Sequence, residues 1–405
     1  MGNLTRRDLL GGAAALSSVA LTGTGLAGTA RAAGDAEIVI GTTTSLSGPV
    51  SSIGVQARAE EAYFNMINDQ GGVGGRKIRF MINDDGFNPA KTLEHARRML
   101  ENDRVLFLFG NLGTATNSAI VKYVNEQKTP HLFLGVVGHR WGDYQKHPWT
   151  MGFGPNGRTE ARIFAKYVLG KKPDATFGIL YQNDDYGRDY LLGVRDVLGE
   201  AGAARITAAP YEVTGATVDS QITALRAANT DALLLGVTPK FGAQAIRRVY
   251  EMQWKPKFYY LCSGSASING VINPAGPERA VGIMSGGYMK DTGDSRWAND
   301  PGTQAYLSFM KKYFPAGNTS DLYVQHGFTV AELMVKVLRQ CNGDITRERI
   351  MKEAANLKNV ELSLLLPGIR VNTSPTDYFP IKQFQLMDFN GRNWNLQGEV
   401  IGDPL

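Results

Sequence analysis

The sequence is poor in cysteine, with only Cys262 and Cys341 among 405 residues. Two thiols are too few for a disulfide scaffold, and a chain of this length buries a sufficient core without one. Their separation also lacks the short spacing of cysteine-based metal sites. Histidine offers no metal site either, because His131, His139 and His147 are eight residues apart, which suits neither a helix nor a hairpin. We therefore expect no metal and no cofactor.

A strong charge of one sign is also absent. Lysine and arginine number 43 against 38 aspartates and glutamates, which gives a formal net charge of +5. The basic residues are scattered along the chain rather than clustered, so nothing resembles the basic stripe of a nucleic-acid-binding surface. Nucleic acid is therefore not an expected partner.

Catalytic constellations are missing as well. Ser308 and Lys311 match S-x-x-K, but the companion motifs of that chemistry are absent, and a helical serine and lysine pair arises easily by chance. No G-x-S-x-G elbow and no cysteine and histidine pairing stands out. The sequence favours a binding protein over an enzyme, and a turnover assay would test the enzyme alternative.

Long apolar runs are absent after the first 33 residues, so no segment of about 18 apolar residues predicts a membrane span. Residues 1–33 resemble a twin-arginine signal peptide: Arg6 and Arg7 precede a glycine-rich apolar stretch, and Ala30-x-Ala32 fits the small-residue cleavage rule. We expect cleavage near Ala32 or Ala33 and release into the periplasm.

What the sequence does contain is a regular alternation. From Glu37, short β-branched or apolar runs (IVIGTTT, KIRFMIND, VLFLF) alternate with amphipathic ones (QARAEEAYFNMIND, PAKTLEHARRML). The rhythm restarts at TFGILYQ (176–182) and continues through DALLLGV and KFYYL. Near-continuous apolar strands between helices predict parallel sheets covered on both faces, here in two similar α/β units. Asn390-Gly391 between alternating residues predicts a late β-hairpin.

The stretch VLFLFGNLGTATN (105–117) reads as a buried strand, a turn rich in glycine and threonine, and a helix start. Such a turn presents free backbone N–H groups, which favours an anion. It lacks the Lys-Ser/Thr of a P-loop and the glycine spacing of a dinucleotide fingerprint, so the predicted anion is smaller than a nucleotide.

Two further turns of small residues follow strands, namely 45–49, which contains Ser47, and GVVG (135–138), which contains Val136 and Gly138. Ligands of open α/β sheets bind at the carboxyl ends of the strands, so all three turns are candidate contacts. Tyr186 in NDDYG suits a pocket wall because its ring has a polar tip. The acidic residues beside it either cap the next helix or take part in binding.

The order LSGP, GGVGGRKIRFMINDDGFNPAKT, GNLGT and NDDYG resembles the branched-chain amino acid binding proteins of bacterial ABC importers over nearly all of the mature chain. The resemblance implies an α/β type I periplasmic binding fold, with two Rossmann-like lobes that contain parallel sheets and are joined by three crossover strands. It places lobe 1 at 34–152 with 287–365 returning to it, and lobe 2 at 153–286 with 366–405 returning. It also implies a monomer that carries its ligand to an inner-membrane ABC permease.

Carried over by position, the resemblance places Thr114 at the ligand carboxylate, with Ala115 or Thr116 as backbone donors, and places Tyr186 in the cleft. Other positions depart from the family pattern. Ile53 replaces an aromatic residue, Gly138 a threonine and Thr238 a tyrosine, and Cys262 or Ser263 replaces the glutamate that receives an α-ammonium group.

The missing glutamate bears on the ligand, because a buried ammonium group needs a carboxylate partner. Asp184 or Asp185 could supply that partner. If neither reaches the cleft, the sequence favours an aromatic monocarboxylate stacked on Tyr186 with Trp141 or Phe241. The alternatives are leucine, isoleucine or valine in the same transporter class, and a ligand-sensing receptor domain.

Overall fold

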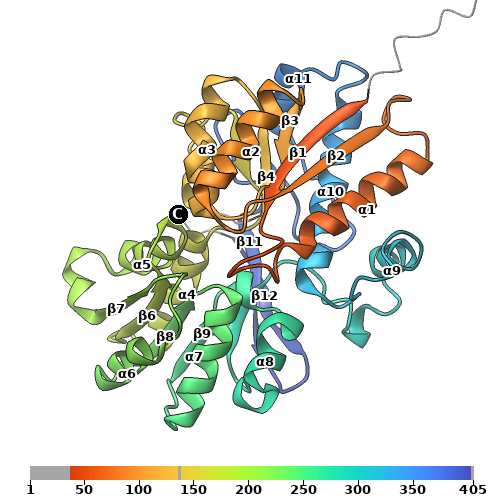
Figure 1. Cartoon of the computed structure of the whole chain (residues 1–405). Coiled ribbons are helices and arrows are strands. Elements are labelled where there is room, and N and C mark those ends of the chain that lie inside the picture. Colours follow the sequence, from red (N-terminus) through yellow and green to blue (C-terminus); the bar gives the residue numbers. More distant parts are fainter. Residues whose placement is uncertain (1–36, 136–137, 403–405) are drawn as a thin grey trace, which may run out of the picture.

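The computed structural model describes residues 37–135 and 138–402. The expected signal peptide and Val136 lie outside the described residues. The chain forms two α/β units, and Figure 1 shows the first in red to gold above the second in green. No described helix has both the length and the apolar character needed to cross a membrane.

The first unit contains a five-stranded parallel sheet in the order β2-β1-β3-β4-β5. Its strands are β1 (Ile38–Thr44), β2 (Ile78–Asp84), β3 (Phe107–Phe109), β4 (His131–Leu134) and β5 (Thr150–Gly152), and its helices are α1 (Val55–Asp69), α2 (Pro89–Glu101) and α3 (Thr114–Glu126). The strand and helix alternation predicted from the sequence is confirmed here. In α2 the Asn88 side chain accepts the N–H groups of Ala90 and Lys91, and Pro89 occupies the first turn.

The second unit contains a seven-stranded sheet in the order β12-β11-β10-β9-β8-β6-β7. Its strands are β6 (Phe177–Gln182), β7 (Ile206–Tyr211), β8 (Ala232–Gly236), β9 (Phe258–Leu261), β10 (Met284–Gly287), β11 (Gln383–Phe389) and β12 (Trp394–Gly402). Its helices are α4 (Gly157–Lys171), α5 (Asp185–Leu198), α6 (Asp219–Ala227), α7 (Pro239–Glu251) and α8 (Asn273–Ala275). Strand β11 pairs antiparallel with β10 and with β12, and the predicted hairpin at Asn390-Gly391 is confirmed.

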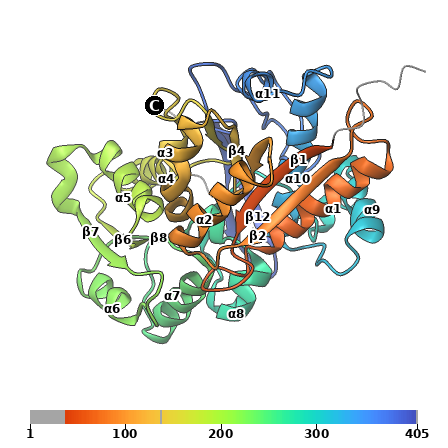
Figure 2. The ribbon, with the colours of Figure 1, turned by 45° about the horizontal axis from the view of Figure 1, so that its top comes forward.

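Three segments pass between the units. The first, 153–156, joins β5 to α4, and the second follows β10. The chain then forms α9 (Pro301–Tyr313), α10 (Leu322–Gln340) and α11 (Arg347–Ala354). Helices α9 and α10 pack against α1, as Figure 2 shows. The third segment follows α11 and leads into β11. Met289 in the second segment pairs with Leu365, so these two passages run side by side.

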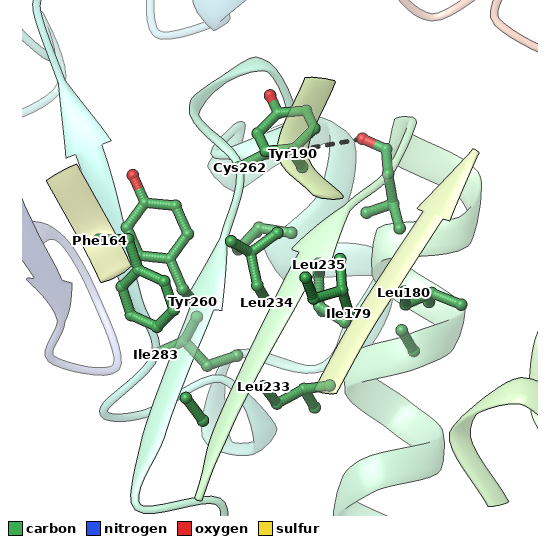
Figure 3. Packing of buried hydrophobic residues seen from close by; sticks show 14 of the residues in the cluster. Phe164, Ile179, Leu180, Tyr190, Leu233, Leu234, Leu235, Tyr260, Cys262 and Ile283 are labelled. Carbon is green, nitrogen blue, oxygen red and sulfur yellow. Dashed lines mark hydrogen bonds between the residues drawn. The ribbon is translucent and has the colours of Figure 1, made fainter. Parts of the chain in front are cut away.

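Each unit has its own apolar core. In the second unit the core gathers around β6, β8 and β9, where Ile179, Leu234 and Tyr260 are fully buried (Figure 3). The core of the first unit includes residues from α9 to α11 and also Leu366 to Ile381. The segment 366–381, expected with lobe 2, therefore contributes side chains to the first core, and the chain joins the second sheet at β11. The division of the remaining chain into lobes stays a prediction.

Candidate ligand-binding site

A cavity of about 390 Å³ lies where the carboxyl ends of both sheets' strands meet, and we call it the cleft cavity. The described residues that line it are Val50, Ile53, Phe87, Leu112, Gly113, Thr114, Gln182, Tyr186, Thr238, Pro239, Gly264 and Ser265. The first six come from turns after β1, β2 and β3, and the others follow or end β6, β8 and β9. Strand ends of this kind are where α/β sheets bind ligands.

The first-unit wall of the cleft cavity contains the N-terminus of α3. Asn117 donates the first helical hydrogen bond to Gly113 O at 3.1 Å, so the N–H groups of Thr114, Ala115 and Thr116 precede it. Gly113 has φ +94°, and a β-carbon there would stand 2.5 Å from the Phe87 ring. Only glycine fits this turn without strain. The free N–H groups and the helix dipole together favour an anion.

The Thr114 hydroxyl completes this end of the cavity. Thr114 is 1% exposed, and its Oγ1 has no hydrogen-bond partner within the described part of the chain. The neighbouring Thr116 differs, because its hydroxyl donates to Gly113 O at 2.9 Å and to Leu112 O. Of the two threonines, Thr114 alone therefore has a hydroxyl available to a ligand, while Thr116 offers its backbone N–H.

The second-unit wall contains Tyr186 and Thr238, as the sequence predicted. The Tyr186 hydroxyl donates to Val237 O at 3.2 Å, and the ring packs edge-on against Tyr190. Thr238 Oγ1 lies 3.3 Å from the Tyr211 hydroxyl. These hydroxyls are occupied by the protein itself, so this wall presents mainly ring and methyl surface. Ile53 approaches from the first unit and adds to that apolar surface.

Several residues that were predicted to contact the ligand lie outside the cleft cavity. Ser47 is exposed, and its N–H bonds Asp84 Oδ1 at 3.2 Å, because the turn after β1 bends outward at this point. Phe241 is fully buried against Tyr211 with its ring centroid 4.4 Å away, so it is a core residue rather than a cavity wall. Trp141 is also fully buried and does not line the cleft cavity.

The sequence predicted that Cys262 or Ser263 lies in the cleft, and the structure corrects this prediction. The Cys262 thiol is fully buried behind Tyr186 and donates to Val237 O at 3.2 Å. The Ser263 hydroxyl points to Glu160 at 3.0 Å, and Ser263 lines a different cavity of about 680 Å³. The 3₁₀ turn 263–265 produces this arrangement by presenting Gly264 and Ser265 to the cleft instead.

Glu160, which the sequence analysis missed, is a buried carboxylate beneath this turn. It accepts hydrogen bonds from the Tyr260 hydroxyl at 2.8 Å, the Tyr190 hydroxyl at 3.2 Å, and Ser263 N–H at 2.6 Å. Figure 3 shows Tyr190 and Tyr260 with their hydroxyls toward the strands' carboxyl ends. Burial raises the pKa of Glu160 to about 7, although the hydrogen bonds oppose that shift. Its oxygens are occupied by these donors and do not line the cleft cavity.

Phe87 was missed as well. It follows β2 and precedes the helix cap Asn88, and it has the positive φ of +61°. The Asp85 carboxylate accepts Phe87 N–H at 2.8 Å and holds the turn so that the ring reaches the cavity. Gln182 also lines the cavity, and its position as the last residue of a predicted strand was the available signal.

No acidic side chain lines the cleft cavity among its described residues. The Asp184 carboxylate accepts hydrogen bonds from Gly187 N–H at 3.1 Å and from Gln182 Nε2 at 2.6 Å, so it caps the N-terminus of α5. Asp185 pairs with Arg140 of the first unit. Neither aspartate is therefore placed to receive an ammonium group in the cavity. Across the described residues no cluster of three or more histidine, cysteine, aspartate or glutamate side chains could hold a metal ion.

Comparison with known families decides the identity of this architecture. A family model described as periplasmic binding protein matches residues 37–393. The chain belongs to the periplasmic binding protein family. The type I fold expected from the resemblance is confirmed, and the family's members bind solutes for transport.

Individual relatives of this periplasmic binding protein are distant. A Leu/Ile/Val-binding protein homolog 1 from Brucella abortus is 19% identical over 80% of this chain and 85% of its own. A branched-chain amino acid ABC transporter from Thermus thermophilus, solved with bound valine, superposes with a TM-score of 0.81 at 14% identity, covering 92% and 98% of the two chains. A fatty acid ABC transporter substrate-binding protein from Thermomonospora curvata gives 0.74 at 19% identity, covering 91% and 93%. At these identities the structures show the fold alone.

Proposed function

We propose that this periplasmic binding protein holds a small carboxylate ligand in the cleft cavity and delivers it to an inner-membrane ABC permease, with an aromatic monocarboxylate as the favoured ligand. In this proposal the chain is exported, cleaved near Ala32 or Ala33, and acts as a periplasmic monomer. It is a carrier and performs no catalysis.

The observation that supports this ligand class is the uneven chemistry of the cavity. One end offers the α3 N-terminus and the Thr114 hydroxyl, which has no partner among the described residues, and both suit a carboxylate. The rest presents mainly apolar surface from Val50, Ile53, Phe87 and the Tyr186 ring, beside the neutral polar residues Gln182, Thr238 and Ser265, and no described lining residue is acidic. A ligand with one negative charge and a flat apolar body satisfies both ends, since aromatic rings stack favourably on Phe and Tyr.

Branched-chain amino acids are the second candidate, supported by what the relatives bind. The Brucella and Thermus proteins bear branched-chain names, and the latter holds valine. The Thermomonospora protein has the same fold and is named for fatty acids, so the fold accepts carboxylates without an α-ammonium group. An α-ammonium group in this cavity would lack a carboxylate partner among the described lining residues, and burying it so is costly.

Calorimetry on the mature protein separates the candidates. We expect trans-cinnamate or 4-hydroxybenzoate to bind at micromolar concentration or below, and L-leucine to bind much more weakly. A thermal-shift screen of both classes supplies the control, because a ligand that binds only the folded state raises the melting temperature. Micromolar binding of L-leucine without any response to the aromatic acids would refute the aromatic assignment.

A further inference from the structure

A second cavity, of about 680 Å³, lies beside the second and third segments that pass between the units, and we call it the crossover cavity. Tyr288 of the second segment and Leu366 of the third both line it. Among the described lining residues, none is shared with the cleft cavity. The volume falls within the range of about 300–1,000 Å³ that small-molecule sites occupy.

The turn 263–265 stands between the two cavities. Ser263 lines the crossover cavity, whereas Gly264 and Ser265 line the cleft cavity. The Tyr323 hydroxyl donates to Gly264 O at 3.1 Å and joins the start of α10 to this turn. The crossover cavity is therefore a separate site and not an extension of the cleft.

Much of the lining of the crossover cavity is apolar or aromatic. Met387 and Trp394 come from β11 and β12 of the second unit, and Trp297 comes from the first unit. The Trp394 indole N–H donates to Ala266 O at 2.9 Å, so its polar edge is already satisfied. These walls suit an apolar body, and aromatic faces also attract a cation.

The two cationic side chains that line the crossover cavity already have partners. Lys290 Nζ donates to both carboxylate oxygens of Asp300 at 2.8 Å and to Ser363 O at 3.0 Å, which uses all three of its protons. Arg296 pairs with Asp294 at 3.6 Å. Neither cation is left to receive an anionic ligand.

Asp291 lines the same cavity and has no such partner. Its Oδ1 accepts Gly293 N–H at 2.9 Å, and no described residue forms an ion pair with it. Burial raises the pKa of the Asp291 carboxyl, although the Gly293 hydrogen bond opposes that shift. A cation inside the cavity would supply the missing countercharge.

Gln325 adds a second acceptor beside Asp291. It lines the cavity and is 2% exposed, and its Nε2 donates to Thr292 Oγ1 at 2.7 Å and to Thr319 O at 3.3 Å. These bonds fix the amide, because a flip would set its oxygen against the Thr319 carbonyl. Gln325 Oε1 then receives no hydrogen bond from the described residues, which is costly for a buried acceptor. Thr292 directly follows Asp291, so the two acceptors lie on neighbouring segments.

We propose that the crossover cavity is a second ligand site, which takes a small organic cation with a primary ammonium group on an apolar or aromatic body. The Asp291 carboxylate and Gln325 Oε1 accept the ammonium N–H groups, and Trp297 and Trp394 contact the body. An ammonium group suits this arrangement because it carries three donors and one positive charge. This site is the chemical opposite of the cleft cavity and does not depend on the proposed function.

Calorimetry on the mature protein without a cleft ligand tests the site with phenethylamine as the probe. We expect one-to-one binding with a Kd below about 1 mM. Phenethyl alcohol keeps the body and removes the charge, and phenethyltrimethylammonium keeps the charge and removes the N–H donors. Both should bind at least about tenfold more weakly, because each loses one of the two features that the acceptors recognise.

Two variants locate the bound probe. Asp291→Asn removes the charge while its side-chain oxygen can still accept Gly293 N–H, and it should weaken phenethylamine binding about ten- to a hundredfold. Trp297→Ala removes part of the aromatic wall and should weaken binding about tenfold. Asp344→Asn, at an exposed residue outside the cavity, is the matched control and should leave binding within about threefold of wild type. Thermal denaturation verifies that each variant folds.

The outcomes keep this inference apart from the proposed function. If phenethylamine does not bind the wild-type protein, or binds Asp291→Asn equally well, the inference is wrong. Equal binding of phenethyl alcohol also overturns it, because the site would then recognise only the apolar body. The cleft acid is titrated into Asp291→Asn separately, and we expect its affinity to stay within about threefold of wild type. A parallel loss of both ligands would show that Asp291 supports the fold and is not a site residue.

Discussion

The two walls of the cleft cavity use similar residues in opposite ways. On the first-unit wall, the Thr114 hydroxyl has no hydrogen-bond partner among the described residues, and the N–H groups of Thr114, Ala115 and Thr116 precede the first helical hydrogen bond of α3. On the second-unit wall, the hydroxyls of Tyr186 and Ser265 both donate to Val237 O, at 3.2 and 2.6 Å. A hydroxyl that is already bonded contributes shape, whereas a free one contributes recognition. The comparison teaches that residue type alone does not identify a ligand contact.

The difference between the two walls also indicates the order in which they meet a ligand. A ligand whose anion meets the preformed first-unit donors can bind before the second unit closes over its body. A ligand that touches both walls stabilises the closed arrangement, as in hinge-bending proteins generally. The Gly113, Thr114 and Tyr186 variants below therefore test one wall against the other, and Glu160→Gln tests the support beneath the turn 263–265.

Gly113→Ala should have the largest effect, because it alters the turn that builds the first-unit wall. The added β-carbon would stand 2.5 Å from the Phe87 ring and 2.6 Å from Thr116 Oγ1, at a φ of +94°. We expect carboxylate binding to fall more than about a hundredfold and stability to drop by roughly 1–3 kcal/mol. Calorimetry and urea denaturation measure the two effects, and binding at wild-type strength would show that the turn is not part of the site.

Thr114→Val should weaken binding about ten- to a hundredfold, because a hydrogen bond to a charged group contributes roughly 1.5–3 kcal/mol. The fold should remain intact, since the hydroxyl has no partner within the described residues. Thr116→Val is the matched control, because the Thr116 hydroxyl that this change removes donates to the backbone O of Gly113. Equal affinity in wild type and Thr114→Val, measured by calorimetry, would place the carboxylate elsewhere.

Glu160→Gln should change how stability depends on pH. Burial raises the pKa of Glu160 to about 7, so this group stabilises the fold at low pH and loses that contribution as pH rises through 7. Between pH 5 and 8 the loss is on the order of 3 kcal/mol. Asp189, with a pKa raised to about 7, acts in the same direction, and His131, with a lowered pKa, acts oppositely.

Asp189 and His131 remain in the variant, so the difference in pH-dependent stability between wild type and Glu160→Gln isolates the contribution of Glu160. Chemical denaturation at pH 5 and pH 8 gives the comparison, and we expect the variant to lose less stability on going to pH 8. Parallel behaviour of the two proteins would show that Glu160 stays ionised throughout that range.

Tyr186→Phe should have the smallest effect on binding. Its hydroxyl bonds Val237 O rather than the cavity, so we expect affinity to change by less than about threefold. Stability should fall by about 1 kcal/mol from the lost hydrogen bond. Tyr186→Ala, which removes the ring, should weaken binding much more. A large loss of affinity in Tyr186→Phe would show that this wall also recognises the ligand by a polar contact.

The alternation of strands and helices in each unit could be predicted because apolar runs and amphipathic segments alternate along the sequence. Tyr186 was placed from the pattern, because it follows a predicted strand and the carboxyl ends of parallel strands share an edge. Thr114 and Thr238 were placed by position through the family resemblance, and all three line the cleft cavity. Their positions needed no knowledge of side-chain packing.

The residues that the prediction misplaced depend on turn geometry. Ser47 turns outward with its N–H bonded to Asp84, and Phe87 turns inward through a positive φ that aromatic residues rarely adopt. Carrying the family's positions over without gaps put Cys262 or Ser263 in the cleft, but the 3₁₀ turn presents Gly264 and Ser265 instead. Glu160 was missed because its partners come from β9, α5 and a turn distant in sequence.

The Arg140 and Asp185 pair bears on how long a ligand stays bound. It joins the two units, and its side chains remain about a third to a half exposed, at 36% and 45%. Mobile ions screen such a pair strongly at about 0.1 M salt, whereas they barely reach the buried donors of the cavity. We therefore expect added salt to shorten the residence time of the ligand more than it slows ligand association. Under the proposed function, ionic strength would then affect how readily the ligand is released.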